Sequence, residues 1–273
     1  MLSQLSNNKP MPINLVIVRN GFSEGALALL QKDTNVLKKL GSSHNSKWRL
    51  TDCGKLQALE TGIWLQKNFK NQFSAFLTGE YIRSLETAAG LKIPNAKWLP
   101  SLYLRPRDFG SLADFNRTRN ENEIAEQMAQ RERDSFYWTP PHGESIAHLT
   151  LRTRRIIHWI KSHVPSTGSV LIVTHKDVME TFRIRIERIS QMEYKQAILH
   201  PPRQNRLNHC SIIHYTRQDP ITKQLDPHYK WMRIITPWMG KDFITNNFSK
   251  IVHRTYSNEE LLAQVSIFPH LFQ

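Results

Sequence analysis

Short apolar runs that alternate with amphipathic helical patterns constrain the fold of this chain most strongly. Four runs have the length and composition of buried β-strands, and they cover residues 15–18, 75–78, 170–174 and 211–215. Apolar residues recur at helical spacing in several of the stretches between them. Such alternation is typical of an α/β protein, so we predict a three-layer, mostly parallel sheet flanked by helices.

Capping residues and apolar periodicity predict where the main helices begin. Thr51 can cap one helix and Ser145 another, and a third helix follows the strand at 170–174. The residues expected to face the core are Leu56, Leu59 and Ile63 in the first helix, and Ile146, Leu149, Thr153, Ile156 and Ile160 in the second. One more strand after residue 215 and a short helix over 258–265 complete the expected elements.

The organisation along the chain indicates one decorated domain. A chain of 273 residues can bury most of its apolar surface in a single core. Residues 104–143 have mixed charge, few periodic apolar residues and the turn-rich end "WTPPHGES", a pattern typical of an insertion over the open end of a sheet. We therefore predict an N-terminal tail (1–13), one domain (14–236) with a lid at 104–143, and a C-terminal extension (237–273).

The charge of the chain favours an anionic partner. A formal net charge of +14 and a pI near 9.9 attract phosphorylated ligands, nucleic acid and acidic surfaces. Basic clusters such as Arg152-Thr153-Arg154-Arg155 lie on predicted helices without interleaved stacking aromatics, so we interpret them as solvated surface. The sequence therefore favours a phosphorylated partner over a nucleic acid.

Cysteine content and hydropathy restrict the setting of the protein. Cys53 and Cys210 are far apart and show no metal-ligand spacing, so we expect no disulfide framework, no metal site and no cofactor. The apolar runs are far shorter than the roughly 18 residues that span a bilayer, and the N-terminus has no signal-peptide pattern. We expect a cytoplasmic protein without a transmembrane segment.

Polar side chains at the ends of the predicted strands are the candidate functional residues. Arg19 and Asn20 follow the first strand in "NLVIVRNGFSEG", Arg83 lies early in the helix after the second, and His175 ends "SVLIVTH". Open α/β sheets bind ligands at the carboxyl ends of their strands. Two guanidinium groups, an imidazole and a helix N-terminus favour a phosphate site, because the planar arginine fork matches phosphate oxygens.

Six motifs occur in a specific order: "LVIVRNGFSEG", "RLTDCGKLQALETGIWL", "YIRSLETA", "LRPRDFGSL", "FYWTPPHGES" and "VLIVTHKDVM". From about residue 14 to about residue 236 the chain resembles the histidine phosphatase superfamily, the phosphoglycerate-mutase-like group. The resemblance implies that a first histidine attacks phosphorus, two arginines and a second histidine hold the phosphoryl oxygens, and a carboxyl group protonates the leaving group. Carried over by position, Arg19, Arg83 and His175 match the phosphate clamps, and Ser23 matches a minor contact.

Two positions differ from the family pattern, and they are the positions of the nucleophile and of the general acid. Asn20 stands at the nucleophile position and Pro106 at the acid position, while Lys176 replaces a usual glycine and adds a cation beside His175. A neutral imidazole offers a basic lone pair, whereas the amide nitrogen of asparagine is delocalised into its carbonyl. Loss of the general acid costs a further factor of about 10²–10⁴. We predict that the phosphate pocket survives while the phosphohistidine mechanism is lost or severely weakened.

Three functions stay open from the sequence. The first is a pseudophosphatase that binds a phosphorylated small molecule or a phosphoprotein. The second is an active phosphomonoesterase with an atypical or engineered-away nucleophile. In the atypical case Asp108 or Glu144 supplies the acid and His142 or His175 attacks. In the engineered case Asn20 replaces a histidine, which leaves Pro106 unexplained. Glu144 also has a structural role available at a helix N-terminus. The third function is a basic interaction scaffold.

Overall fold

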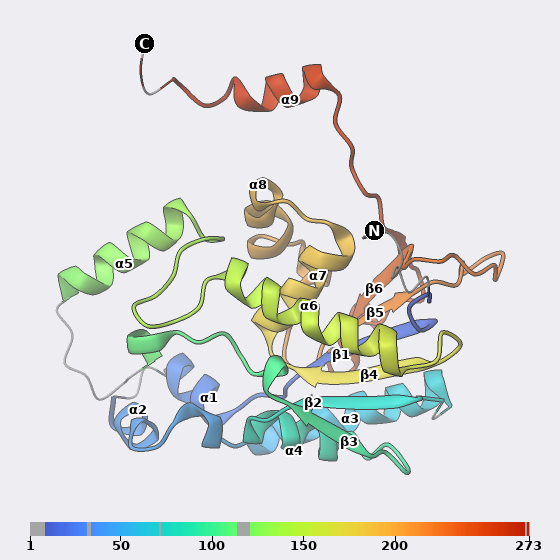
Figure 1. The fold of residues 1–273 in the computed structure, drawn as a ribbon. Helices are drawn as coiled ribbons and strands as arrows, with labels where there is room; N and C mark the ends of the chain where they lie inside the picture. Colours follow the sequence, from blue (N-terminus) through green and yellow to red (C-terminus); the bar gives the residue numbers. More distant parts are fainter. Residues whose placement is uncertain (1–8, 32–33, 71, 114–120, 271, 273) are drawn as a thin grey trace, which may run out of the picture.

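A mixed sheet forms the centre of the molecule in the computed structural model (Figure 1). The structure describes residues 9–31, 34–70, 72–113, 121–270 and 272. Within these ranges the sheet has seven strands in the order β3-β2-β4-β1-β5-β6-β7. The strands are β1 (Asn14–Arg19), β2 (Ala75–Gly79), β3 (Trp98–Ser101), β4 (Ser169–Thr174), β5 (Ile212–Thr216), β6 (Trp231–Ile235) and β7 (Ser249–Lys250).

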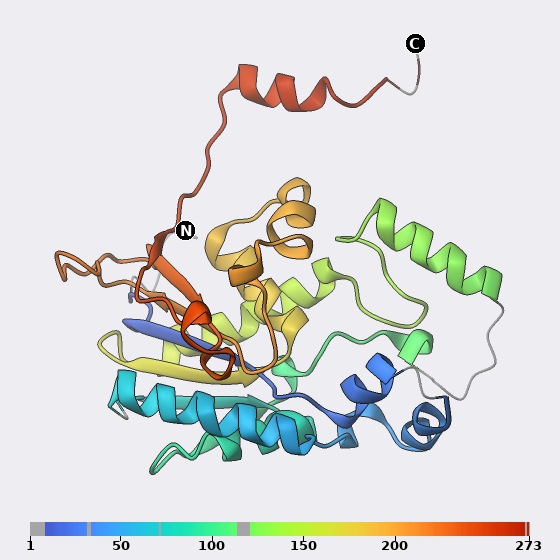
Figure 2. The ribbon, with the colours of Figure 1, turned by 180° about the vertical axis from the view of Figure 1, so that it is seen from behind.

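Helices cover both faces of this sheet (Figures 1 and 2). The helices are α1 (Glu24–Gln31), α2 (Thr34–Gly41), α3 (Asp52–Phe69), α4 (Ile82–Gly90), α5 (Glu121–Arg133), α6 (Ile146–His163), α7 (Lys176–Glu187), α8 (Gln191–Tyr194) and α9 (Asn258–Val265). Helices α6 and α7 lie on one face, and α3 and α4 lie on the other. The strands β1 to β4 pair in parallel and β5 to β7 pair antiparallel, which confirms the predicted three-layer α/β fold.

The central strands read as continuous apolar runs because both of their faces are covered. Every residue of β4 is buried, as are the inner residues of β1. Leu15 and Ile17 belong to the core under α6 and α7, and Val16 and Val18 belong to the core under α3. By the same alternation Arg19, the last residue of β1, lies on the face of α6 and α7.

The prediction of which side of α3 faces inward is wrong. Leu56 and Ile63 are 64% and 53% exposed, whereas the buried face carries small residues such as Gly54 and Gly62. A Cβ atom at Gly62 would lie 2.0 Å from the carbonyl oxygen of Leu91, so a glycine is needed for this close backbone approach. The helix therefore packs inward through Trp64 and Leu65 in the core and through glycines at close backbone contacts, and not through the predicted stripe.

The other predicted caps and elements are confirmed. Ser145 accepts a hydrogen bond from the backbone nitrogen of His148, and Thr51 accepts one from Gly54. All five residues predicted to face inward on α6 are buried: Ile146, Leu149, Thr153, Ile156 and Ile160. The extra strand after residue 215 is β6, and the short C-terminal helix is α9.

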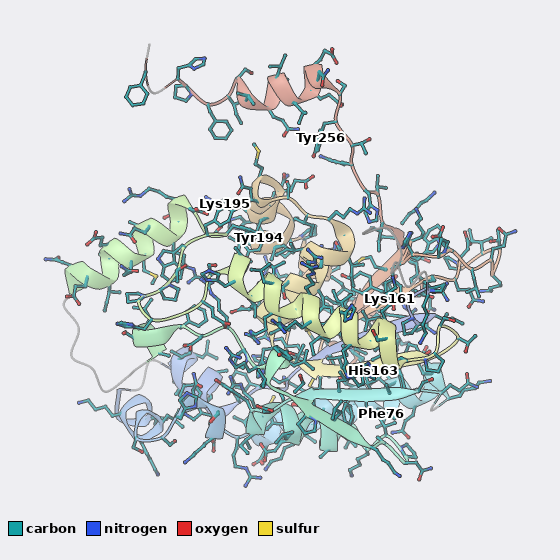
Figure 3. The ribbon with its side chains drawn as sticks, viewed as in Figure 1. Phe76, Lys161, His163, Tyr194, Lys195 and Tyr256 are labelled. Carbon is teal, nitrogen blue, oxygen red and sulfur yellow. The ribbon has the colours of Figure 1, made fainter. Side chains whose placement is uncertain are left out.

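The segments predicted to decorate the domain have structure of their own. Residues 104–143 include α5, while residues 1–8 and 114–120, in the predicted tail and lid, lie outside the described residues. In the C-terminal extension β7 pairs with β6, and the chain then leaves the body through Tyr256 to the exposed helix α9 (Figure 3). A lid function for residues 104–143 stays a prediction. Among the described helices, none has the length and apolar character needed to cross a membrane.

Candidate functional site

The loop after β1 is held by close backbone contacts. The Asn20 backbone nitrogen donates to the Thr174 carbonyl oxygen at 2.7 Å, and the Gly21 nitrogen donates to Thr87 Oγ1 at 3.0 Å. A Cβ atom at Gly21 would lie 2.6 Å from the Gly54 carbonyl oxygen, so this glycine lets the loop pack against α3. The buried Asn20 side chain donates from Nδ2 to the Gly21 carbonyl oxygen at 2.9 Å. The loop is therefore rigid, and its asparagine amide is engaged locally.

Arg19 reaches across the end of β1 to the segment before β5. Its NH1 donates to the Leu207 carbonyl oxygen at 2.6 Å, and its NH2 lies 3.2 Å from His209 Nε2. Its Nε is buried and has no hydrogen-bond partner among the described residues. Burial lowers the pKa of Arg19, although Asp177 and Glu180 nearby act in the opposite direction. Arg19 is therefore a partly buried cation whose buried Nε has no partner among the described residues.

His209 is a member of this group that the sequence did not suggest. Its Nδ1 lies 3.2 Å from the Asn20 carbonyl oxygen, and its ring meets the Phe22 ring edge to face at 5.2 Å. Burial, with the charge of Arg19 second, lowers the pKa of His209 to about 3. The imidazole is therefore neutral and lies directly beside the backbone of Asn20. A lone histidine in a loop gives no motif signal from which this position could be predicted.

Arg83 and His175 meet around Tyr81, at the start of α4. The Arg83 guanidinium carbon lies 4.9 Å from the centre of the Tyr81 ring, and the His175 ring meets the same ring edge to face at 5.6 Å. Arg83 NH1 donates to the Asn45 carbonyl oxygen at 2.7 Å. Burial lowers the pKa of Arg83 to about 10. His175 Nε2 lies 3.1 Å from Ser84 Oγ, so α4 positions both candidate clamps.

The charges of three arginines converge on His175. This histidine is buried at the N-terminal cap of α7, and burial lowers its pKa well below the ordinary value. The charges of Arg83, Arg19 and Arg152 lower it further, in that order. The histidine is therefore neutral, and the positive potential around it comes from the guanidinium groups. This electrostatic centre brings the Arg19 and Arg83 parts of the site together.

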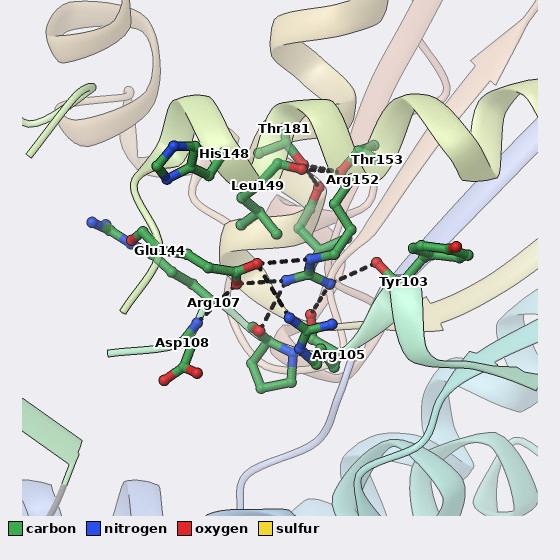
Figure 4. Close-up of polar contacts among 12 residues, drawn as sticks. Tyr103, Arg105, Arg107, Asp108, Glu144, His148, Leu149, Arg152, Thr153 and Thr181 are labelled. Atoms are coloured by element: carbon green, nitrogen blue, oxygen red, sulfur yellow. Dashed lines mark hydrogen bonds and ion pairs between the residues drawn. The ribbon is translucent and has the colours of Figure 1, made fainter. Parts of the chain in front are cut away.

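A second network surrounds Arg152 on α6 (Figure 4). Its Nε and NH2 donate to the two carboxylate oxygens of Glu144 at 3.1 and 2.9 Å. Its NH1 donates to the carbonyl oxygens of Tyr103 and Arg105 at 2.8 and 2.9 Å, and its NH2 also donates to that of Pro106 at 3.1 Å. Arg152 is only 8% exposed, so the interpretation of its cluster as solvated surface is wrong for this residue.

The carboxyl group of Glu144 is held ionised by this network. Burial raises its pKa, but the hydrogen bonds and charge of Arg152, the backbone nitrogen of Asp108 and the charge of Arg105 outweigh burial and leave the pKa lowered. Arg105 NH2 lies 3.3 Å from Glu144 Oε1. Glu144 therefore fastens the loop that carries Pro106 to the start of α6.

The remaining predicted site residues are exposed or have other partners. Asp108 is exposed and accepts a hydrogen bond from Gly110 at its Oδ1, and His142 is exposed with a φ of 61°. Lys176 forms an ion pair with Glu180 at 3.5 Å, and Ser23 Oγ accepts from the Ala26 nitrogen at the start of α1. Within the described ranges, no group of three or more histidine, cysteine or acidic side chains could hold a metal ion.

Comparisons with known proteins identify the family of this chain. The family model of the histidine phosphatase superfamily (branch 1) matches residues 15–223. The 2,3-bisphosphoglycerate-dependent phosphoglycerate mutase of Bartonella bacilliformis is 26% identical over 190 residues, which cover 66% of this chain and 84% of that protein. The enzyme of the same name from Bartonella henselae is 25% identical over 191 residues, covering 67% of this chain and 85% of that protein.

Solved structures share the fold. The mycobacterial glucosyl-3-phosphoglycerate phosphatase in complex with VO3 superimposes with a TM-score of 0.55 at 18% identity, over 74% of this chain and 92% of that chain. A mutant phosphoserine phosphatase from Entamoeba histolytica in complex with phosphoserine gives a TM-score of 0.53 at 17% identity, over 75% and 91%. With a family model matched over most of its length, this chain belongs to the histidine phosphatase superfamily.

Proposed function

We propose that this protein is a pseudophosphatase toward alkyl phosphates, which binds a phosphorylated ligand through Arg19, Arg83 and His175 and has lost the family's nucleophile at position 20 and its general acid at position 106. The observation that carries the proposal is a pair of partly buried arginine side chains without an ion-pair partner among the described residues. Neither arginine forms an ion pair with a carboxylate among the residues that the structure describes, and burial lowers the pKa of both. Partial burial without an ion-pair partner costs a guanidinium part of its hydration, and a phosphate dianion would supply both charge and hydrogen-bond acceptors.

The contacts of Asn20 argue against attack on phosphorus. Its side-chain nitrogen donates to the Gly21 carbonyl oxygen, and an amide nitrogen has no lone pair available for attack. Turning this side chain would not change that chemistry. Asn20 can donate a hydrogen bond to a bound phosphate, so its contribution is to binding.

The surroundings of Pro106 argue against protonation of a leaving group. Proline has no proton to give, and its carbonyl oxygen is occupied by Arg152. Glu144 is ionised because the pKa of its carboxyl group is lowered. An ionised carboxylate held by two guanidinium groups cannot act as a general acid at neutral pH. Alkyl phosphates have alkoxide leaving groups that need a proton, so this site should bind them as ligands without cleaving them.

Relatives suggest the class of ligand. One structural neighbour is named as a phosphatase of a glucosylated phosphoglycerate, and another is a phosphoserine phosphatase with phosphoserine bound. Both names describe a small organic phosphate that carries a further carboxylate. A small anionic phosphomonoester suits the net charge of +14 as well. Phosphoserine is therefore a reasonable first probe.

The test combines binding and turnover. Isothermal titration with vanadate, inorganic phosphate and phosphoserine would be compared for the unchanged chain, for Arg83→Ala and for Arg154→Ala, an exposed arginine on α6 that serves as the control. We expect Arg83→Ala to weaken binding roughly 10- to 100-fold, the worth of a hydrogen bond to a charged group, and Arg154→Ala to have little effect.

The same preparations decide between the three functions. No release of phosphate from phosphoserine is expected. Steady release of phosphate from phosphoserine by the unchanged chain would make it an active phosphomonoesterase and end the pseudophosphatase proposal. Binding that Arg83→Ala leaves unaltered, or no binding at all, would favour a basic scaffold that has abandoned the pocket.

A further inference from the structure

The two ring nitrogens of His209 have different partners, and these partners fix its tautomer. Arg19 NH2, at 3.2 Å from Nε2, can only donate, because guanidinium groups have no acceptor. Nε2 must therefore carry the lone pair. The proton is then on Nδ1, which donates to the Asn20 carbonyl oxygen at 3.2 Å. His209 thus presents a lone pair to the arginine that is the candidate phosphate clamp.

The segment that carries His209 is held from several sides. Trp238 Nε1 donates to the His209 carbonyl oxygen at 2.6 Å, and Thr61 Oγ1 donates to that of Cys210 at 3.2 Å. Cys210 has a φ of 54°, which turns the chain sharply into β5. Arg19 itself donates to the Leu207 carbonyl oxygen at 2.6 Å. A side chain on such a fixed turn is positioned before any ligand arrives.

The electrostatic setting of His209 resembles that of His175. The charges of Arg19 and Arg83 act on both imidazoles, and burial is the largest cause of the lowered pKa of each. His209 is therefore unprotonated at neutral pH, as a nucleophile must be. Two arginines thus lie among two neutral histidines, even though Asn20 has replaced one histidine of the family pattern.

We propose that His209 is a phosphoryl acceptor, whose Nε2 attacks a phosphoryl group bound to Arg19 when the donor has a stable leaving group. Acyl phosphates and aryl phosphates are donors of this class. The inference rests on the proposed anion binding by Arg19 and Arg83, and it goes beyond that binding by assigning a covalent step to a residue outside the family motifs.

The step balances without a general acid. Arg19 NH2, which donates to Nε2 in the structure, turns to a phosphoryl oxygen of the bound donor and so frees the Nε2 lone pair. This lone pair forms the nitrogen–phosphorus bond, while the bond from phosphorus to the bridging oxygen breaks and its electron pair leaves with a carboxylate or phenolate. These anions need no proton, which suits a site with Pro106 at the acid position. The Nδ1 proton stays on the ring, hydrogen-bonded to the Asn20 carbonyl oxygen. Water later attacks phosphorus, so both of its hydrogens leave with the released phosphate and the neutral imidazole returns.

The low basicity of His209 is compatible with this step. Phosphoryl transfer passes through a loose transition state with little bonding to the nucleophile, so position and the charge of nearby arginines matter more than basicity. Alkyl phosphates would stay uncleaved, because their alkoxide leaving groups need the missing acid. The inference is therefore consistent with a protein that binds phosphoserine without hydrolysing it.

The experiment labels the full chain with acetyl phosphate that carries radioactive phosphorus. Phosphohistidine is recognised because its label survives alkali and is lost in acid, and mass spectrometry then locates it. His209→Asn keeps a donor for the Asn20 carbonyl oxygen, His209→Gln keeps an acceptor for Arg19, and neither has a nucleophilic nitrogen. His148→Gln, an exposed histidine at the start of α6, is the matched control.

We expect label at His209 in the unchanged chain and in His148→Gln, and loss of label to background in both His209 variants. Label at another histidine, label that persists in the His209 variants, or no label at all would overturn the inference. Vanadate titration of the unchanged chain separates the two proposals. Binding without label contradicts only the phosphoryl acceptor, whereas no binding contradicts the proposed function as well.

Discussion

Replacing Arg152 with alanine should destabilise the protein strongly. All five N–H groups of this guanidinium are engaged, two with Glu144 and three with backbone carbonyl oxygens. Removing one partner of a buried ion pair costs about 3–5 kcal/mol. The Glu144 side chain keeps 17% exposure and Arg105 lies 3.3 Å away, so part of its charge stays compensated. We therefore expect a loss near the lower limit, about 3 kcal/mol of unfolding free energy.

Urea unfolding at neutral pH, followed by circular dichroism, measures this loss. Arg154→Ala, an exposed neighbour on α6, is the control and should change the free energy of unfolding by less than about 0.5 kcal/mol. A double variant, Arg152→Met with Glu144→Leu, should lose less than Arg152→Ala, because no unpaired carboxylate remains and the Arg105 side chain, at 33% exposure, reaches solvent. A loss below about 1 kcal/mol for Arg152→Ala would show that water replaces the guanidinium, and our account of the network would then be wrong.

Acid should reduce the effect of Arg152→Ala. The folded pKa of Glu144 is lowered from its ordinary value of 4.5, so the stability that ionised Glu144 contributes is present above pH 4.5 and is lost as pH falls through the folded pKa. The difference between the unchanged chain and the variant should therefore shrink below pH 4.5. A difference that stays constant with pH would mean that the pair does not depend on the Glu144 charge.

Three further predictions address the site and its support. Asn20→His combined with Pro106→Glu should give release of phosphate from phosphoserine, and an inactive double variant that still binds vanadate would contradict the assigned positions. Burial and the charge of Asp177 raise the pKa of Glu180 to about 7, so the free energy of unfolding should fall as pH rises from 4.5 toward 7. In urea titrations Glu180→Gln should flatten this dependence on pH, and the same dependence in both proteins would refute the raised pKa of Glu180. Gly21→Ala should cost about 1–3 kcal/mol, because its Cβ atom would lie 2.6 Å from the Gly54 carbonyl oxygen, and an unaltered melting temperature would count against this contact.

The sequence predicted the sheet better than it predicted helix packing. Strands β1 and β4 are covered on both faces, so their apolar runs are unambiguous. The predicted inward face of helix α3 is wrong because its apolar stripe, with Leu56 and Ile63, faces solvent. Its inward face approaches other backbone at Gly62, where shape and not hydrophobicity decides the packing. Hydrophobic periodicity cannot reveal a contact made through the absence of a side chain.

The residues of the candidate site could be predicted only where they lie at the end of a strand or at the start of a helix. Arg19, Arg83 and His175 follow strands or begin helices, so topology alone places them at one edge of the sheet. Arg152 looked like one of several surface cations, although it shares the inward face of α6 with Leu149 and could have been assigned from that spacing. His209 lies in a turn whose approach to Asn20 depends on β5 pairing with β1, and sequence spacing carries no sign of that.

The place of β1 in the sheet has a consequence for synthesis. Among the described strands β1 comes first in the sequence and lies inside the sheet, yet its neighbours are made much later: Asn14 pairs with Ser169 on β4 and with Thr216 on β5. Until both have left the ribosome, an apolar strand waits with its backbone hydrogen bonds open on both sides. Exposed strands of this kind invite pairing with other chains. The nascent chain should therefore need protection by chaperones until β4 and β5 have emerged, and the sheet should form around β1 only then.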